Sequence, residues 1–239
     1  MSTQYLEHGL RRIGIPDFLR LALDERKSRH AIREAIAEYK KSPLTPELVD
    51  TTWQTLWGEW GKRVRGTFDV PSCDRTPEEL AQLQKENKAV LLIPDNLDLV
   101  MLGNMFPEMK RRAIQAETTV TDEQSTGGCV DIEMDIESPH GNTTEDQAIE
   151  SLKLQGRNGQ RLKTYFIGSE FSKALTGHGF DNNTFSRLPG SRSKYIYDRE
   201  DRMMYAPFFT IGHVPHDVLL FPHDHQPHIG FRSEGVKKA

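Results

Sequence analysis

The sequence predicts an α+β protein in which a helical N-terminal layer packs on a mixed, mostly antiparallel β portion. Apolar residues recur at helical spacing through the first 60 residues. After residue 180, short apolar segments are separated by Gly and Pro, which is typical of strands joined by turns. A chain of 239 residues can bury about 70% of its unfolded surface, so it is long enough to build a real core.

We therefore expect a helical region over residues 1–70 and an α+β region over residues 71–239, which together can form one continuous domain. In the first region one helix starts at Pro16. A second follows Thr45, a capping residue with Pro after it at the first turn. This second helix carries all three tryptophans at helical spacing. We interpret the aromatic stripe as a core-facing surface rather than as a ligand platform.

The second region opens with a capping box, Thr76 and Glu79, that predicts a helix to about Lys88. The further elements expected, in chain order, are a buried strand at residues 89–93, a helix through 97–102 capped by Asp95, an alternating strand at 130–137, a helix from Thr143 or Thr144 to Gly156, a short helix near 169–175, and strands at 184–188, 195–197, 203–211 and 218–221.

Composition and charge disfavour several classes of protein. No apolar run is longer than five residues, too short to cross a bilayer, and charged residues occupy the N-terminus where a signal peptide needs an apolar stretch. Cys73 and Cys129, the two cysteines, cannot make a disulfide framework, so we expect reduced thiols and a cytoplasmic location. The net charge of −4 disfavours a general nucleic-acid binder without excluding a local basic site.

Four carboxylates are expected to share one face of the strand at residues 130–137, where acidic and apolar residues alternate. Neighbouring carboxylates on such a face lie about 6.5–7 Å apart, close enough for two of them to bridge Mg²⁺ or to act as an acid–base pair. The alternative is a half-exposed strand whose polar face only meets solvent. The four residues are Asp131, Glu133, Asp135 and Glu137.

Five of the nine histidines fall within sixteen residues, at His213, His216, His223, His225 and His228. His223 and His225 share one strand face across Asp224, an arrangement that many metal sites use. With His228 as a third ligand, or with His213 or His216 in its place, they would hold a divalent transition metal. The alternative is a surface loop rich in Pro and His.

Residues 183–193 form a dense run of hydrogen-bond donors that we expect on a turn. Arg187 and Arg192 could bind a phosphate or a carboxylate in a bidentate manner, with Asn183 and Ser191 completing the site. The alternative is an ordinary surface loop. Of the patterns in the sequence, this turn is the strongest candidate for a ligand site.

Several short motifs follow one another in the C-terminal half of the chain. In order, they are an alternating Val-Asp-Ile-Glu strand, a helix opening with Thr, Gly156-Arg157, a short helix around Glu170, Asn183 leading to Gly190-Ser191-Arg192, Pro207, and a terminal His228-x-Gly230-x-Arg232-Ser233. In this order, residues 130–235 resemble a bacterial domain family that is itself uncharacterised. The resemblance implies no activity, but it draws attention to Asn183, Ser191 and Arg192.

Two functions from different classes are therefore open. The first is a binding protein that takes an anionic small molecule or an acidic partner surface through the turn at 183–193, with no membrane partner. The second is a metal-dependent hydrolase in which His223 and His225, with carboxylates of the acidic strand, hold a metal that lowers the pKa of a bound water. We favour binding. Convergence of the histidines and the acidic strand in space would favour the hydrolase.

Overall fold

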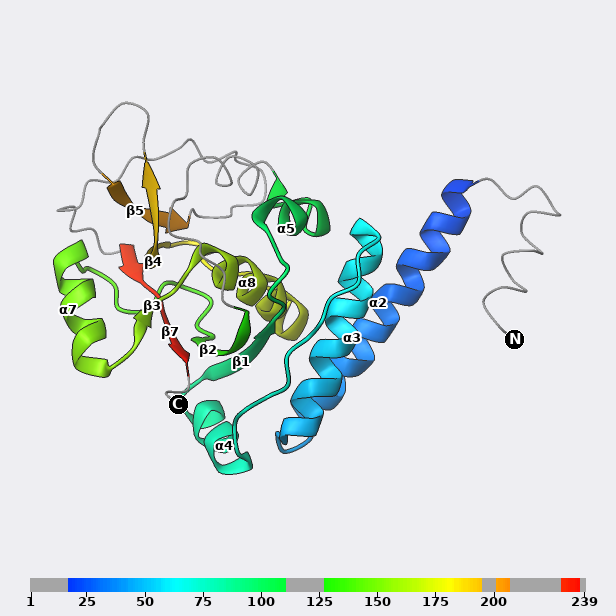
Figure 1. Cartoon of the computed structure of the whole chain (residues 1–239), viewed down its shortest axis with the longest axis horizontal. Helices are drawn as coiled ribbons and strands as arrows, with labels where there is room; N and C mark the ends of the chain where they lie inside the picture. Colours follow the sequence, from blue (N-terminus) through cyan, green and yellow to red (C-terminus); the bar gives the residue numbers. More distant parts are fainter. Residues whose placement is uncertain (1–16, 111–126, 195–200, 207–228, 237–239) are drawn as a thin grey trace.

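A computed structural model describes residues 17–110, 127–194, 201–206 and 229–236, and it confirms the α+β class (Figure 1). The helices are α2 (Asp17–Lys41), α3 (Pro46–Val64), α4 (Pro77–Lys85), α5 (Leu99–Met105), α7 (Glu145–Gln155) and α8 (Leu162–Thr176). The strands are β1 (Lys88–Ile93), β2 (Gly128–Glu133), β3 (Asn158–Gly159), β4 (Phe185–Lys194), β5 (Asp201–Ala206), β6 (Ile229–Phe231) and β7 (Ser233–Val236).

The first two helices form the predicted N-terminal layer. α2 and α3 lie side by side, and the side chain of Thr45 caps α3 as expected (Figure 1). The tryptophan stripe of α3 packs against β1. Trp53 Nε1 donates to the carbonyl of Val90 at 2.9 Å, and Trp57 Nε1 donates to the carbonyl of Leu92 at 2.6 Å. The core-facing interpretation of the stripe is confirmed, and the two indoles join helix to strand.

Two small sheets follow the helical layer. The first has the strand order β1-β2-β7-β3, with all neighbours antiparallel. The second has the order β5-β4-β6, in which β4 is antiparallel to β5 and parallel to β6. Only Arg232 separates β6 from β7, so one C-terminal segment contributes a strand to each sheet.

Several elements differ from the sequence expectation. β2 ends at Glu133, four residues before the end of the alternating pattern. α5 is capped by Asp98 rather than by Asp95, which instead accepts a hydrogen bond from the N–H of Gly127 at 2.8 Å. α8 begins at Leu162, seven residues earlier than expected. The strands β3, β6 and β7 have two to four residues each, which is too short for an alternating pattern to reveal them.

One hydrophobic core crosses the expected boundary near residue 70. The same cluster contains Trp53 of α3, Leu91 of β1, Phe171 of α8 and Leu188 of β4. The rings of Trp53 and Phe171 lie with their centroids 4.9 Å apart. In the described part of the chain, the helical layer and the α+β portion therefore share a core.

Candidate functional site

The carboxylates of β2 are buried, not exposed. Asp131 and Glu133 are only 6% and 7% exposed, because β2 lies inside its sheet and both of its faces are covered. Asp131 accepts hydrogen bonds from Arg75 Nη2 at 3.2 Å and from Arg157 Nη1 at 2.6 Å. The expectation of a half-exposed acidic strand is wrong here, because two guanidinium groups take the place of solvent on the polar face.

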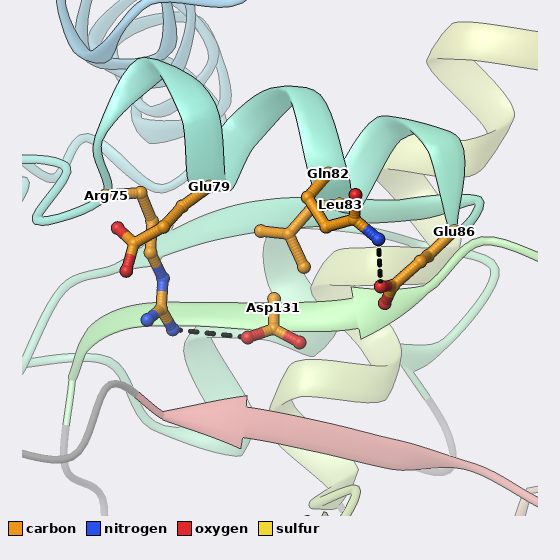
Figure 2. Close-up of a pocket in the computed structure, with 6 residues that line it drawn as sticks. All are labelled: Arg75, Glu79, Gln82, Leu83, Glu86 and Asp131. Carbon is orange, nitrogen blue, oxygen red and sulfur yellow. Dashed lines mark hydrogen bonds and ion pairs between the residues drawn. The ribbon is translucent and has the colours of Figure 1, made fainter.

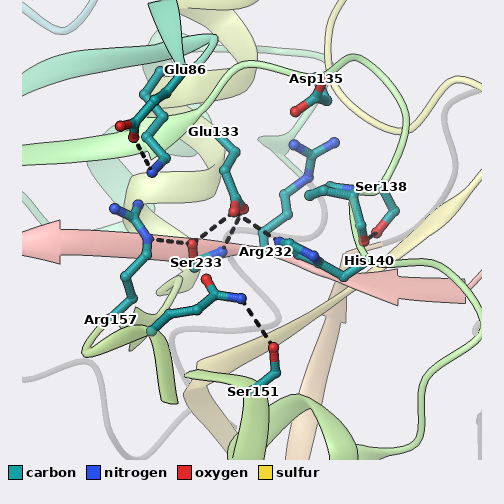
Figure 3. A network of polar contacts seen from close by, with 12 residues as sticks. Glu86, Glu133, Asp135, Ser138, His140, Ser151, Arg157, Arg232 and Ser233 are labelled. Atoms are coloured by element: carbon teal, nitrogen blue, oxygen red, sulfur yellow. Dashed lines mark hydrogen bonds and ion pairs between the residues drawn. The ribbon is translucent and has the colours of Figure 1, made fainter. Parts of the chain in front are cut away.

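Glu133 is the centre of a second polar group (Figure 3). Its carboxylate accepts hydrogen bonds from Ser233 N and Oγ, each at 2.9 Å, and lies 3.0 Å from His140 Nε2. Arg157 Nε donates to Ser233 Oγ at 2.6 Å, which connects this group to Asp131. Burial raises the pKa of Glu133, but the hydrogen bonds from His140 and Ser233 outweigh burial and hold the pKa below its ordinary value.

His140 is the exposed end of this network. Its side chain is 33% exposed, and its ring stacks on Phe231 with the centroids 4.4 Å apart and an interplanar angle of 18°. Its backbone has φ +54°, in the left-handed region that few residues other than Gly and Asn adopt. The carboxylate of Glu133 and the ring of Phe231 fix the orientation of the imidazole.

A third polar group joins the two sheets. Arg232 and Asp181 are completely buried and form an ion pair at 3.0 Å. Arg232 Nε donates to Ser186 Oγ at 2.8 Å, and its guanidinium lies 4.1 Å from the centre of the Phe180 ring. Because each charged group has an opposite charge and further hydrogen bonds, these contacts stabilise the junction between β4 and the C-terminal segment.

A pocket of about 220 Å³ opens between α4 and β2 (Figure 2). Five charged or polar side chains surround Leu83 in its wall: Arg75, Glu79, Gln82, Glu86 and Asp131. Glu79 and Leu83 share one face of α4 because they are four residues apart, and Glu86 follows the helix as its C-cap residue. The backbone N–H of Thr76 donates to Glu79 Oε2 at 2.7 Å, in the capping box that the sequence predicts, and this bond fixes Glu79 at the pocket.

Arg75 lines this pocket, and one of its donors makes no hydrogen bond in the described part of the structure. Its side chain is 8% exposed, and its Nη2 donates to Asp131 and, at 3.5 Å, to the carbonyl of Gly235. Its Nε makes no hydrogen bond among the described residues, although it forms an ion pair with Asp74 Oδ1 at 3.6 Å. A buried donor without an acceptor costs about 1–3 kcal/mol, so Arg75 Nε favours a ligand oxygen.

The pocket wall and its partners among the described residues carry charges of both signs. Three carboxylates line the wall, one guanidinium joins them there, and two further cations bind the carboxylates from outside at 2.6 and 2.7 Å. The carboxylates belong to Glu79, Glu86 and Asp131, and the cations to Arg75, Arg157 and Lys88. Hydrogen bonds from Lys88 and then Gln82 lower the pKa of Glu86. The pocket therefore offers both signs of charge within one small volume.

The segment expected to bind an anion is a strand, not a turn. Residues 185–194 form β4, whose register against β5 shifts between Leu188 and Arg192. The backbone of Arg192 pairs with that of Met203, and its side chain lies outside the described part of the structure. From Phe185 onward, the expected turn is thus corrected to the central strand of the second sheet, which pairs with β5 and, at residues 185–187, also with β6.

The other residues of that predicted site are held within the fold. Arg187 and Ser191 are completely buried, and Ser191 Oγ accepts the N–H of Leu162 at 2.9 Å, at the start of α8. Asn183 is exposed, but its backbone N–H and its Nδ2 donate to Glu137 at 2.9 and 2.8 Å. These side chains therefore bind other parts of the chain.

The metal site predicted at His223, His225 and His228 lies outside the described residues, as do His213 and His216, and it stays a prediction. Among the residues that the structure describes, no group of three or more His, Cys, Asp or Glu side chains could hold a metal ion. The four carboxylates do not share one strand face, because β2 ends at Glu133. Asp135 beyond it accepts a hydrogen bond from Asn87 Nδ2 at 2.9 Å.

Sequence reasoning missed Arg75, Arg157 and His140 as members of the site. Both arginines lie beside helix ends that the sequence marks clearly, one before the capping box of α4 and the other after the C-cap Gly156 of α7. The signal that could have found them is the acidic strand itself. If it lies inside a sheet, its carboxylates require cationic partners from elsewhere in the chain.

No helix among the described residues is long and apolar enough to span a membrane. In the comparisons with known proteins, no family model, curated protein or solved structure matches the chain. The similarity of residues 130–235 to an uncharacterised bacterial family stays a prediction. The pocket between α4 and β2 is therefore identified as a candidate site by its geometry alone.

Proposed function

We propose that the protein binds a small zwitterion in the pocket between α4 and β2. The carboxylate of the ligand binds Arg75, and its ammonium group lies near Glu79 and Glu86. The observation that carries the proposal is the guanidinium of Arg75 in the pocket wall, whose buried Nε has no hydrogen-bond acceptor among the described residues. Ligand binding thus remains the proposed function, with a zwitterion in place of an anion and the pocket in place of the segment at 183–193.

Arg75 is held in position before any ligand arrives. Asp131 fixes its Nη2, and Arg157 holds the other oxygen of Asp131. A guanidinium fixed in this way loses little conformational entropy when it binds a ligand. A hydrogen bond from Arg75 Nε to a carboxylate is charge-assisted and about twice as strong as a neutral one.

The glutamates of α4 supply the opposite charge. A carboxylate has about four lone-pair sites, which is more than Glu86 uses with Gln82 and Lys88. A simple anion would meet the repulsion of Glu79 and Glu86, whereas a ligand that also carries an ammonium group is attracted by both. The balance of charge favours a zwitterion over an anion of the same size.

The size of the pocket limits the ligand to a few heavy atoms. Its volume of about 220 Å³ lies below the range of about 300–1,000 Å³ that is usual for drug-sized ligands. Leu83 provides an apolar contact for a short methylene chain between the two charged ends. Short amino acids match these requirements.

The proposal is tested by isothermal titration calorimetry with glycine, β-alanine and γ-aminobutyrate as probes, and with acetate and methylamine as single-charge controls. We expect at least one zwitterion to bind more tightly than both controls. Glu79→Gln keeps a residue that can complete the capping box and removes the charge, so it should weaken this binding about tenfold, or about 1.4 kcal/mol.

A steric pair of variants separates the pocket from the rest of the surface. Leu83→Trp fills the pocket and should abolish binding, whereas Leu154→Trp, at a side chain that is 83% exposed, should leave it unchanged. Equal affinity for acetate and the zwitterions would contradict the ammonium site. Absence of binding by every probe, or binding that survives Leu83→Trp, would overturn the proposal.

A further inference from the structure

Cys73 and Cys129 meet where the segment before α4 lies beside β2. Their thiols hydrogen-bond to each other, and two residues further along both segments Arg75 pairs with Asp131. The backbone N–H of Cys73 donates to Asp50 Oδ1 at 2.6 Å, which ties this segment to α3. Both cysteines are free thiols. Three contacts therefore hold the segment in the position that brings the two sulfur atoms together.

The two thiols differ in exposure and in acidity. Cys73 is half-buried, whereas Cys129 is 7% exposed and faces the core. The hydrogen bond from Cys129 lowers the pKa of Cys73 to about 7, which outweighs the effect of burial. The same hydrogen bond and burial raise the pKa of Cys129. Its greater exposure and its lowered pKa both favour Cys73 as the attacking thiol, with Cys129 held behind it.

We propose that Cys73 and Cys129 form a thiol–disulfide exchange site whose co-reactant is a small-molecule disulfide such as oxidised glutathione. The thiolate of Cys73 attacks one sulfur of the co-reactant, which breaks its S–S bond, forms a mixed disulfide and releases one thiolate. Cys129 then loses its proton, attacks Cys73 Sγ and expels the second thiolate. The two protein thiols are oxidised to one disulfide, and the co-reactant is reduced to two thiols.

Asp74 provides a route for the proton of Cys129. Its side chain hydrogen-bonds to the Cys129 thiol and is 49% exposed, so it connects this buried group to solvent. A disulfide between Cys73 and Cys129 would replace the hydrogen bond between the two thiols. In both segments this link lies two residues before the ion pair of Arg75 with Asp131. The exchange site does not depend on the ligand proposed for the pocket, because different side chains form it.

The test incubates the folded full-length chain with oxidised glutathione near neutral pH, quenches with acid, alkylates the remaining thiols and measures the intact mass. The wild type should lose both alkylatable thiols, lose two hydrogens in mass and carry no glutathione. Cys129→Ser should accumulate one glutathione on Cys73, because no second thiol can resolve it. Cys73→Ser should leave Cys129 unmodified on the same timescale.

Two controls keep the outcome interpretable. Circular dichroism and urea unfolding establish that the Ser variants are folded, and the wild type in urea gives the reactivity of two exposed, separated thiols. A stable glutathione adduct on the wild type would overturn the proposal, since the second thiol would then not reach the first. Two thiols that stay alkylatable, or that react no faster when folded than in urea, would overturn it as well.

Discussion

The neighbouring strands β1 and β2 are both buried, yet they are covered by opposite chemistry. β1 meets the indoles of Trp53 and Trp57 on α3. β2 carries Asp131, which is covered by guanidinium groups that come from 56 and 26 residues away in the sequence. Apolar burial tolerates many partners because it is not directional, whereas a buried carboxylate requires donors at fixed positions. The second arrangement places in a pocket wall the side chain of Arg75, whose Nε has no hydrogen-bond acceptor among the described residues.

The largest expected loss of stability comes from a substitution in the apolar contact between α3 and β1. Trp53→Ala should destabilise the protein by about 5 kcal/mol, the upper end for such a truncation, because it leaves a cavity and removes the hydrogen bond to the carbonyl of Val90. Urea unfolding followed by circular dichroism measures the change. Leu154→Ala, at an exposed residue of α7, is the control and should change stability little. A small effect of Trp53→Ala would show that α3 does not close the core.

The next largest loss of stability is expected from a substitution in the polar cluster around Asp131 of β2. Asp131→Asn removes the charge that two arginines share, and we expect a loss of about 3 kcal/mol, because the buried Arg75 and the half-buried Arg157 lose their partner while the amide oxygen still accepts one bond. Asp74→Asn, at a half-exposed residue 3.6 Å from the same Arg75, should cost less than about 1 kcal/mol. Equal losses of stability for the two variants in urea unfolding would mean that burial does not strengthen the ion pair of Asp131 with Arg75.

The smallest effect is the acid dependence of stability that Glu133 contributes. Its pKa in the folded protein lies below the ordinary value of 4.5, so its contribution is present above that value and is lost as the pH falls through the lower, folded pKa. Urea unfolding between about pH 7 and about pH 3 should therefore show a shallower loss for Glu133→Gln than for the wild type. Glu150→Gln, on the exposed side of α7, should keep the wild-type slope. An unchanged slope of stability against pH for Glu133→Gln would contradict the assignment of this acid dependence to Glu133.

The apolar half of this comparison could be predicted from the sequence. Helical spacing of the tryptophans predicted the face of α3, and Thr76 with Glu79 predicted the capping box that now fixes a pocket residue. These signals are local, because each involves residues within a few turns of one another.

The polar half could not be predicted in the same way. Alternation predicted that Asp131 and Glu133 share a face, but a strand at a sheet edge and a strand at its centre give the same pattern. The partners of Asp131 come from two other segments, and Arg187 and Ser191 are covered by packing that sequence distance does not reveal. The sequence alone therefore predicts a turn at 183–193, where the structure has most of β4.

The central claim is that Arg75 Nε is the ligand donor of the pocket, and NMR of the arginine Nε–H groups tests it directly. The signal of Arg75 is assigned by its loss in Arg75→Lys, and β-alanine is then added to the wild type. We predict that the Arg75 signal shifts as it gains an acceptor, while the signal of Arg157, whose Nε already donates to Ser233 at 2.6 Å, stays in place. An Arg75 signal that does not move at saturating β-alanine, glycine and γ-aminobutyrate would contradict the account.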